Sequence, residues 1–508
     1  MKKLCRIMLA CVLAMSCMMA PLAYAEGLTE DPIVIDIFRV AHPSSSLTDL
    51  PEEGFPVDQL VEEMFNVKLE VRYVPATNAN DIYNTMMAAN EVNTLVQNTF
   101  ANLDKYADAW ATLNDYIVGK YANLEAAYFD DPFINAQTAM ENGDVRILST
   151  LNSQKQGDIL LVRGDLVEKY DVDISEVNTK EEWTDLLAMI KEEEPDVVPY
   201  GTRYQRPGLT NRLAFGWSGI NEDFFTEDDT VKFGCTDERM YEVIEWLRDM
   251  YAEGLIDVDY PTSTTTEWQE KVLGRGIFLT HDNPSSRMDW ALTQWESLGY
   301  TDRYYMPVAP IYPEEGVPGK TVFQYPSFQD SWAISKNASP ETIDRIMQIF
   351  DYGFTDEGYV LYNWGIEGVY FDYVDGKPVV RPEYSDFSQG NKGIALCFTR
   401  RVYNGIEFSS NPRVLEAQEM YVDGGLIIPN YIQMLRLTED ELKVYNTLYP
   451  DIKTYMDENL DAFIFGTKEL NPENWDEFVA GFDALGLEEV LEAYNAALDR
   501  IMVVVNKE

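Results

Sequence analysis

Arginines and aromatic rings share a segment of the chain that contains no acidic residue. Residues 197–221 hold no Asp or Glu, although these two types occupy 87 of the 508 positions. The segment carries three arginines, Arg203, Arg206 and Arg212, beside the aromatic residues Tyr200, Tyr204 and Trp217. Guanidinium groups bind carboxylates and hydroxyls, and rings stack on flat faces, so one interpretation is the wall of a ligand site. The alternative is a buried or supporting segment whose side chains pack internally.

Two other stretches have a similar character. Residues 387–406 form a second acid-free gap, with Lys392, Arg400 and Arg401. The sequence NWGIEGVYFDY at 363–373 combines a Trp, a Glu and three more aromatic residues with two glycines. One interpretation is that its rings form a platform on which a flat ligand is stacked. The alternative is that Trp364 and Tyr370 fill the end of a lobe while the glycines only turn the chain.

Catalytic and metal-binding motifs are incomplete throughout the chain. The chain has two histidines, His42 and His281, which cannot form a HExxH helix or a His-rich metal site. GWSG at 216–219 lacks the closing glycine of a nucleophile elbow, and residues 171–182 place Glu176 where a calcium loop needs glycine. Paired carboxylates are uninformative in so acidic a chain. We expect no catalytic residue, no metal and no cofactor.

The surrounding pattern is that of an α/β protein. The run DPIVIDIFRV at 31–40, rich in β-branched residues, predicts a buried strand, residues 57–65 a helix, and the alternating VKLEVRYV at 67–74 a second strand. A helix at 81–89 and a strand at 94–97 continue this rhythm, which is typical of a mostly parallel sheet. Later helices are predicted at 180–193 and 238–253, and from the caps Ser339-Pro340 and Asn471-Pro472. Trp475 falls on the apolar stripe of the last of these and is predicted to be core.

Length, charge and the N-terminus indicate a large exported protein. Residues 1–25 have the basic start, apolar run and Ala-Tyr-Ala exit of a signal peptide, with cleavage predicted after Ala25. A lipid anchor at Cys17 is the weaker alternative, because the residues around it suit a lipobox and tether poorly. Cleavage removes three basic residues and no acidic one, so the net charge moves from −48 to −51. Such a charge excludes nucleic acid as a partner, and only Cys235 and Cys397 remain for a disulfide. The length predicts two lobes.

Four stretches of the chain resemble the extracellular solute-binding proteins of ABC importers, in the carbohydrate branch that includes maltodextrin-binding proteins. They are residues 157–187, 247–260, 354–373 and 458–500. The resemblance implies a two-lobed periplasmic-binding-protein fold of type II character, each lobe a mostly parallel sheet flanked by helices, with the ligand in a cleft between the lobes. It places lobe 1 at 26–148 plus 309–365 and lobe 2 at 149–308 plus 366–508. Closure of the lobes on the ligand would then be recognised by the membrane permease.

The resemblance also implies which positions meet the ligand. His42 follows the first strand and Asn98 ends the strand at 94–97, while Arg203 and Tyr204 match a charged residue and a ring in sugar-binding relatives. His281 and Asn283 stand where maltodextrin binders place tryptophans, which argues against maltodextrin itself. The complete predicted set is His42, Asn98, Arg203, Tyr204, Trp217, His281, Asn283, Tyr325, Trp364 and Glu367.

The sequence therefore predicts a monomeric, extracytoplasmic receptor that delivers an oligosaccharide to an ABC transporter permease and catalyses nothing. The arginines of the acid-free segments favour an anionic or decorated glycan. The alternatives are a peptide receptor, which would pair strand edges with an extended backbone, a glycan-active enzyme, and a ligand-sensing partner of a membrane receptor.

Overall fold

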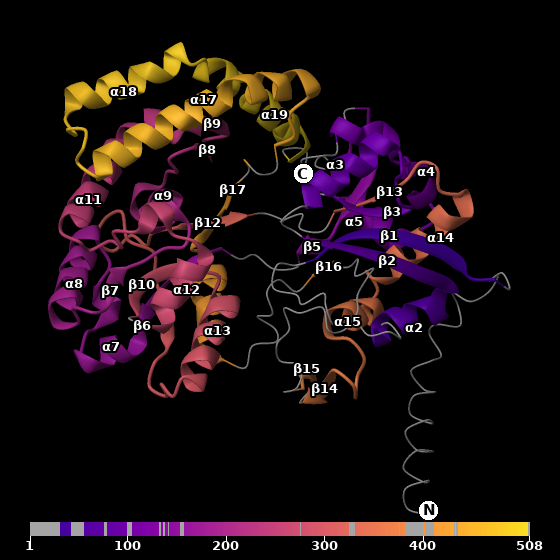
Figure 1. The fold of residues 1–508 in the computed structure, drawn as a ribbon, viewed down its shortest axis with the longest axis horizontal. Coiled ribbons are helices and arrows are strands. Elements are labelled where there is room, and N and C mark those ends of the chain that lie inside the picture. Colours follow the sequence, from indigo (N-terminus) through magenta and orange to yellow (C-terminus); the bar gives the residue numbers. More distant parts are fainter. Residues whose placement is uncertain are drawn as a thin grey trace, which may run out of the picture. The chain divides into compact units, whose positions relative to one another are not determined.

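The structure is a computed structural model. It describes residues 31–41, 55–75, 79–98, 104–131, 134–135, 138–140, 142–152, 157–274, 276–324, 331–374, 376–381, 400–401, 411–430, 432 and 435–505. The chain divides into two compact units (Figure 1). Unit 1 comprises Met1–Asn152 and Phe328–Arg401, and unit 2 comprises Ser153–Ser327 and Val402–Glu508.

Unit 1 is built on a five-stranded sheet with the order β2-β1-β3-β13-β4. Its strands are β1 (Ile33–Ala41), β2 (Val67–Pro75), β3 (Leu95–Asn98), β4 (Ile147–Ser149) and β13 (Ser331–Ile334). β1 pairs in parallel with β2 and with β3, whereas β13 runs antiparallel to both of its neighbours, β3 and β4.

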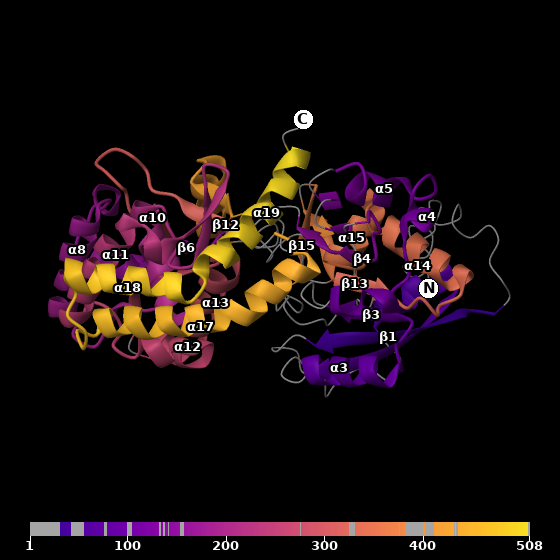
Figure 2. The same ribbon diagram turned by 90° about the horizontal axis from the view of Figure 1, so that it is seen from above.

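Helices cover both faces of the unit 1 sheet (Figure 2). Alternate side chains of β1 point to opposite faces, so Ile35 and Ile37 join one core while Phe38 joins the other. The first face packs against α2 (Pro56–Phe65), α4 (Asn114–Ile117), α5 (Ala122–Tyr128), α14 (Pro340–Tyr352) and α15 (Asp356–Trp364). The second packs against α3 (Ala79–Ala89).

Unit 2 contains a four-stranded sheet with the order β11-β6-β10-β7. The strands are β6 (Ile159–Arg163), β7 (Val198–Tyr200), β10 (Ile277–Asp282) and β11 (Tyr305–Val308). β6 runs antiparallel to β10 and to β11, while β10 and β7 are parallel. One face packs against α12 (Thr265–Leu273), α13 (Pro284–Ser297) and α16 (Pro412–Gln418), and α8 (Lys180–Glu193) contacts β7.

The C-terminal helices of unit 2 form a layer over a hairpin. α17 (Glu439–Ile464), α18 (Pro472–Ala484) and α19 (Leu487–Val505) lie side by side in both views (Figures 1 and 2). α17 contacts α11 (Glu238–Ala252), and α19 contacts β9 (Thr230–Phe233), which pairs with β8 (Phe224–Glu227). Trp475 is 6% exposed and packs against Phe463 and Phe478, as predicted for a core residue.

The remaining elements are short. They are the pairs β5 (Leu151–Asn152) with β16 (Arg400–Arg401), β12 (Thr321–Gln324) with β17 (Ile427–Asn430) and β14 (Phe371–Val374) with β15 (Lys377–Val380), and the helices α7 (Gly164–Lys169), α9 (Gln205–Gly208) and α10 (Phe215–Ser218). The stretch 209–213 adopts π-helical geometry.

The two-unit α/β architecture agrees with the sequence prediction, but two details differ. Both sheets are mixed rather than mostly parallel, because β13 enters the middle of the unit 1 sheet antiparallel and β6 lies antiparallel between β10 and β11. The unit boundaries also differ from the predicted lobes. Residues 309–327 stay in unit 2 because β12 pairs there with β17, and residues 366–401 stay in unit 1, where β14 and β15 follow α15.

Candidate functional site

Two segments of the predicted site meet at the carboxyl ends of β7 and β10 in unit 2. These neighbouring strands are parallel, with Val198 opposite Ile277 and Tyr200 opposite Leu279. The segments that follow them therefore leave the sheet at the same edge. The backbone there is held by the Gly201 amide donating to the Leu279 carbonyl at 3.1 Å and by the Thr280 hydroxyl donating to the Gly201 carbonyl at 2.8 Å. Ligand sites of α/β proteins form at such edges, where loops converge.

A buried carboxylate, Asp282, organises this edge. Its side chain is 1% exposed and accepts four hydrogen bonds. Arg203 donates from Nε at 2.6 Å and from Nη2 at 3.1 Å, Arg287 donates from Nε at 3.2 Å, and the Asn283 amide donates at 2.8 Å. Burial lowers the pKa of Arg203, but the hydrogen bonds and charge of Asp282 outweigh burial and raise it overall. The carboxylate therefore fixes two guanidinium groups in place.

The half-buried ring of Tyr204 lies beside these arginines. The guanidinium carbons of Arg203 and Arg212 are 4.2 and 4.1 Å from the centre of the ring, within the range of cation–π attraction. Arg203 also donates a hydrogen bond to the Tyr204 hydroxyl, and Arg212 forms an ion pair with Asp158. The ring is thus oriented by charged neighbours on the surface edge of the sheet.

His281 supports Tyr204 from within the unit. Its imidazole is stacked on the Tyr204 ring at a centroid distance of 5.5 Å, and the residue is 2% exposed. Nδ1 is 2.7 Å from the Tyr200 hydroxyl, and Nε2 is 3.5 Å from the Thr202 hydroxyl. Burial, and then the charges of Arg212 and Arg203, hold the pKa of His281 well below its usual value. The ring is neutral at physiological pH and its polar atoms already have protein partners.

We call Asp158, Arg203, Tyr204, Arg212, His281, Asp282 and Arg287 the Asp282 cluster. It contains three of the residues predicted as ligand contacts, and Asn283, which is 7% exposed, adjoins it.

Two residues of the acid-free segment point elsewhere. Arg206 is 4% exposed and forms ion pairs with Glu222, Asp457 and Asp461, which corresponds to the alternative interpretation of a supporting segment. The Trp217 ring meets Trp246 edge-on at 5.9 Å, with the Lys180 ammonium 4.6 Å from its centre. Trp217 thereby joins the packing of α10 against α8 and α11.

The predicted site residues of unit 1 are dispersed. Trp364 is 2% exposed and packs edge-on against Tyr359, so its faces belong to the core in this structure. Gly365 and Gly368 have φ values of 84° and 78°, which other residues rarely adopt, and they turn the chain after α15. Glu367 on this turn is exposed.

Three further residues are placed only in part. Asn98 ends β3 with its backbone opposite Ser331. His42 and Tyr325 lie outside the described residues, as do the predicted signal peptide, Cys17, Cys397 and most of the second acid-free gap. Cys235 is a free, buried thiol.

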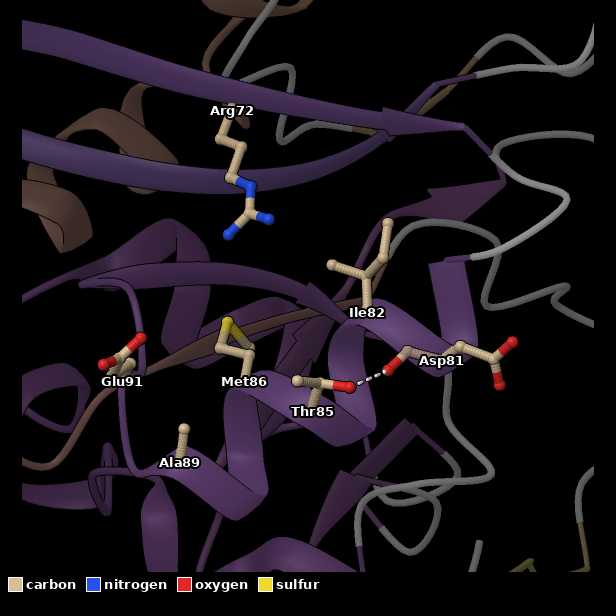
Figure 3. Close-up of a pocket in the computed structure, with 7 residues that line it drawn as sticks. All are labelled: Arg72, Asp81, Ile82, Thr85, Met86, Ala89 and Glu91. Atoms are coloured by element: carbon tan, nitrogen blue, oxygen red, sulfur yellow. Dashed lines mark hydrogen bonds between the residues drawn. The ribbon is translucent and has the colours of Figure 1, made fainter.

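Unit 1 also has a surface hollow of about 420 Å³ between β2 and α3 (Figure 3). Arg72 extends into it from β2, and α3 contributes Ile82, Thr85 and Met86 (Figure 3). The Thr85 hydroxyl donates to the Asp81 carbonyl at 2.8 Å. None of its lining residues is aromatic, so the hollow offers no stacking surface to a sugar, and none was predicted from the sequence.

Sequence reasoning missed Asp282, Arg287 and Asp158. Asp282 lies between two predicted residues, His281 and Asn283, and a buried acid at the end of an apolar strand was the available signal. Arg287 and Asp158 carried no local signal, because each meets the cluster through the tertiary fold.

Neither a metal centre nor a membrane span is found in the part of the chain that the structure describes. No group of three or more His, Cys, Asp or Glu side chains there is arranged to hold a metal ion. In the loop with calcium-like spacing, Asp173 accepts hydrogen bonds from Ser175, and Glu182 closes the capping box of α8 with Thr179. No helix within the described ranges is both long and apolar enough to cross a bilayer.

Comparison with known proteins identifies the fold. No known family profile matches the sequence. The chain is 20% identical over 374 residues to lipoprotein LipO of Bacillus subtilis (strain 168), covering 67% of this chain and 68% of that protein. It is 25% identical over 240 residues to a carbohydrate ABC transporter substrate-binding protein of Streptococcus pneumoniae serotype 4 (strain ATCC BAA-334 / TIGR4), covering 46% of this chain and 47% of that protein.

A solved structure agrees over almost the whole length. The alginate-binding protein AlgQ2 superposes with a TM-score of 0.71 and 21% identity, covering 93% of this chain and 99% of that one. The chain has the fold of a solute-binding protein. The predicted two-lobed α/β fold of a solute-binding protein is thereby confirmed, apart from the mostly parallel sheets, and the relatives are of the predicted kind.

Proposed function

We propose that this chain is an extracytoplasmic receptor that binds an oligosaccharide and delivers it to the permease of an ABC importer. The observation that carries the proposal is the Asp282 cluster, a half-buried ring fixed among arginines at the carboxyl ends of parallel strands, on the fold of a solute-binding protein. A similar protein is named as a carbohydrate substrate-binding protein, and the structural neighbour is named for alginate binding. Rings and guanidinium groups supply stacking and hydrogen bonding for a sugar.

Within the site we propose that Tyr204 and the guanidinium groups on its faces form the surface that a sugar contacts. Arg203 is held by Asp282 and hydrogen-bonded to the Tyr204 hydroxyl, so it keeps the ring in place. Asn283, Asn98, Glu367, His42 and Tyr325 remain predicted ligand contacts from the sequence.

The receptor is proposed to act without catalysis, as a monomer and outside the cytoplasm. The structural neighbour is a binding protein, and one relative is named a lipoprotein. We propose cleavage of the signal peptide after Ala25, with anchoring at Cys17 as the alternative that N-terminal sequencing and mass spectrometry of the exported protein would reveal.

Calorimetric titration with a panel of neutral and acidic oligosaccharides and with a peptide mixture tests the proposal. We expect saturable binding of at least one glycan, no binding of peptides, and no new reducing ends after prolonged incubation. Binding of peptides alone would refute the proposal, and release of reducing ends would show an enzyme.

A pair of tyrosine variants tests the site. Tyr204→Ala should weaken glycan binding roughly tenfold, or by about 1.4 kcal/mol, because the ring that orients the Arg203 and Arg212 guanidinium groups is lost. Tyr300 is 38% exposed beyond the end of α13 and serves as the control, since Tyr300→Ala removes the same kind of ring from another part of unit 2. Equal effects of the two substitutions would contradict the assignment of Tyr204.

A further inference from the structure

Positive charge exceeds negative charge within the Asp282 cluster. Its ion pairs join three guanidinium groups, those of Arg203, Arg212 and Arg287, to the two carboxylates of Asp282 and Asp158. His281, the other ionisable nitrogen base of the cluster, is neutral and adds no charge. A net positive group of this kind stands out in a chain whose formal charge is −48.

The excess positive charge of the Asp282 cluster lies on Arg287. All three guanidinium nitrogens of Arg203 have partners, because Nε and Nη2 bind Asp282, Nη2 also reaches the Tyr204 hydroxyl, and Nη1 is 3.5 Å from the Thr265 hydroxyl. Arg287 uses only Nε, at 3.2 Å from Asp282. Its two terminal nitrogens have no hydrogen-bond partner among the described residues, and its side chain is 22% exposed.

The guanidinium group of Arg287 is nevertheless held in position. Asp282 fixes one edge through Nε, and the buried Trp268 ring lies 6.0 Å from the guanidinium carbon. The indole of Trp268 is itself anchored, since it donates to the Thr280 hydroxyl at 3.2 Å. The opposite edge, which carries the two terminal nitrogens, has the fork geometry that matches both oxygens of a carboxylate.

Arg287 also lies in the first turn of α13, which begins at Pro284. The N-terminus of a helix carries partial positive charge, so it adds to the attraction for an anion at this place. Arg203 and Arg287 share one oxygen of Asp282, so both guanidinium groups lie at the same buried carboxylate.

We propose that this receptor selects an acidic oligosaccharide, and that Arg287 binds the carboxylate of a uronic acid residue. This inference rests on the proposed function, which it narrows to one class of glycan. A neutral sugar would leave the third guanidinium group without a counter-charge, whereas a uronate supplies one negative charge and two acceptor oxygens.

The test compares ligands that differ only in charge. Purified protein is titrated calorimetrically with defined uronic-acid trisaccharides, with the same trisaccharides after reduction of the carboxyl groups to alcohols, and with a sulfated neutral trisaccharide. We expect the uronates to bind at least tenfold more tightly than their reduced counterparts, and this preference to shrink as salt is raised because the site is partly exposed.

The role of Arg287 is tested by substitution. Arg287→Gln should weaken uronate binding roughly 10- to 100-fold, as expected for a lost hydrogen-bonded charge, and should weaken binding of the reduced trisaccharides much less. Arg287→Lys, which keeps the charge but loses the fork, should fall between. The control is Arg248→Gln on α11, where the arginine is 28% exposed and paired with Asp249. It should leave both affinities within twofold, and melting temperatures verify that each variant is folded.

The outcomes separate the two proposals. Equal or tighter binding of reduced or other neutral glycans overturns the inference and leaves the proposed function standing. Tighter binding of the sulfated ligand overturns the choice of a carboxylate. Uronate preference that survives Arg287→Gln overturns the assignment of Arg287. If no glycan of either panel binds, the proposed function itself fails, and the inference fails with it.

Discussion

Replacement of Arg206 by methionine should destabilise unit 2 strongly. The guanidinium group is 4% exposed and donates to both oxygens of Glu222, at 3.0 and 3.2 Å, and the Glu222 side chain is 2% exposed. Glu222 would keep a hydrogen bond of 2.7 Å from the Thr210 hydroxyl but lose its counter-charge. Removing one partner of such a buried pair costs about 3–5 kcal/mol in the free energy of unfolding.

A second consequence concerns α17. Arg206 also donates to the Asp457 carbonyl at 3.2 Å and pairs with Asp461 at 3.0 Å, so it ties the segment before the π-helical turn to that helix. Burial lowers the pKa of Arg206, but Glu222, Asp461 and Asp457 outweigh burial and raise it, so the charge is permanent. Arg206→Met combined with Glu222→Gln should recover a large part of the loss, because no buried charge then remains unpaired.

Differential scanning calorimetry of the wild type, both single variants and the double variant measures these changes in stability. Arg206→Met should lower the transition of unit 2 by on the order of 10 °C. Lys68→Met is the control, because Lys68 is 58% exposed in its ion pair with Glu62 and the loss should stay below about 1 kcal/mol. A melting temperature for Arg206→Met within 1 °C of the wild type, or a double variant less stable than the single one, would refute the reasoning.

Three further predictions concern other parts of unit 2. Burial raises the pKa of Asp223, which accepts a hydrogen bond from the Tyr449 hydroxyl. The folded protein therefore becomes less stable as pH rises above the ordinary pKa of 3.8, because the buried carboxyl group must ionise. Denaturant titrations should show that the free energy of unfolding of Asp223→Asn, relative to the wild type, is higher at pH 7 than at pH 4. Asn471→Ala removes the cap whose side chain accepts from the Asn474 amide at 2.9 Å, and urea unfolding should show a loss of about 1 kcal/mol. Burial raises the pKa of the Cys235 thiol, so a thiol reagent should modify Cys235 slowly in the folded protein and rapidly in urea; fast labelling of the folded protein would contradict its burial.

The fold could be predicted where its signals are local. Thr179 opens α8 at the expected residue, and the caps Ser339 and Asn471 open α14 and α18 as expected, because each cap satisfies nearby backbone amides. The direction of β13 could not be predicted, since its partners β3 and β4 come from distant parts of the chain. The 26-residue helix α17 was missed because Pro450 interrupts its pattern, although the helix continues through it.

For the candidate site, the sequence predicted the types of residue involved better than it predicted which residues contact one another. Arg203, Tyr204 and His281 were selected separately, and the parallel pairing of β7 with β10 brings them together. The arginines of the acid-free segment 197–221 form ion pairs with Asp158, Glu222 and Asp282. These acidic residues lie outside the segment, so its sequence alone does not reveal the pairs. Trp364 shows the opposite case, because an aromatic cluster next to glycines suits a core and a platform equally until burial distinguishes them.

Neither unit is formed by one continuous stretch of the chain, so neither unit can fold completely until distant parts of the chain have been synthesised. The core of the unit 2 sheet includes Val414, Ala417 and Tyr421, and β17 supplies the partner of β12. A nascent chain that ends before residue 402 therefore lacks segments that the core of unit 2 needs. Truncations from the C-terminus should expose apolar surface early, and proteases would remove such fragments before they accumulate.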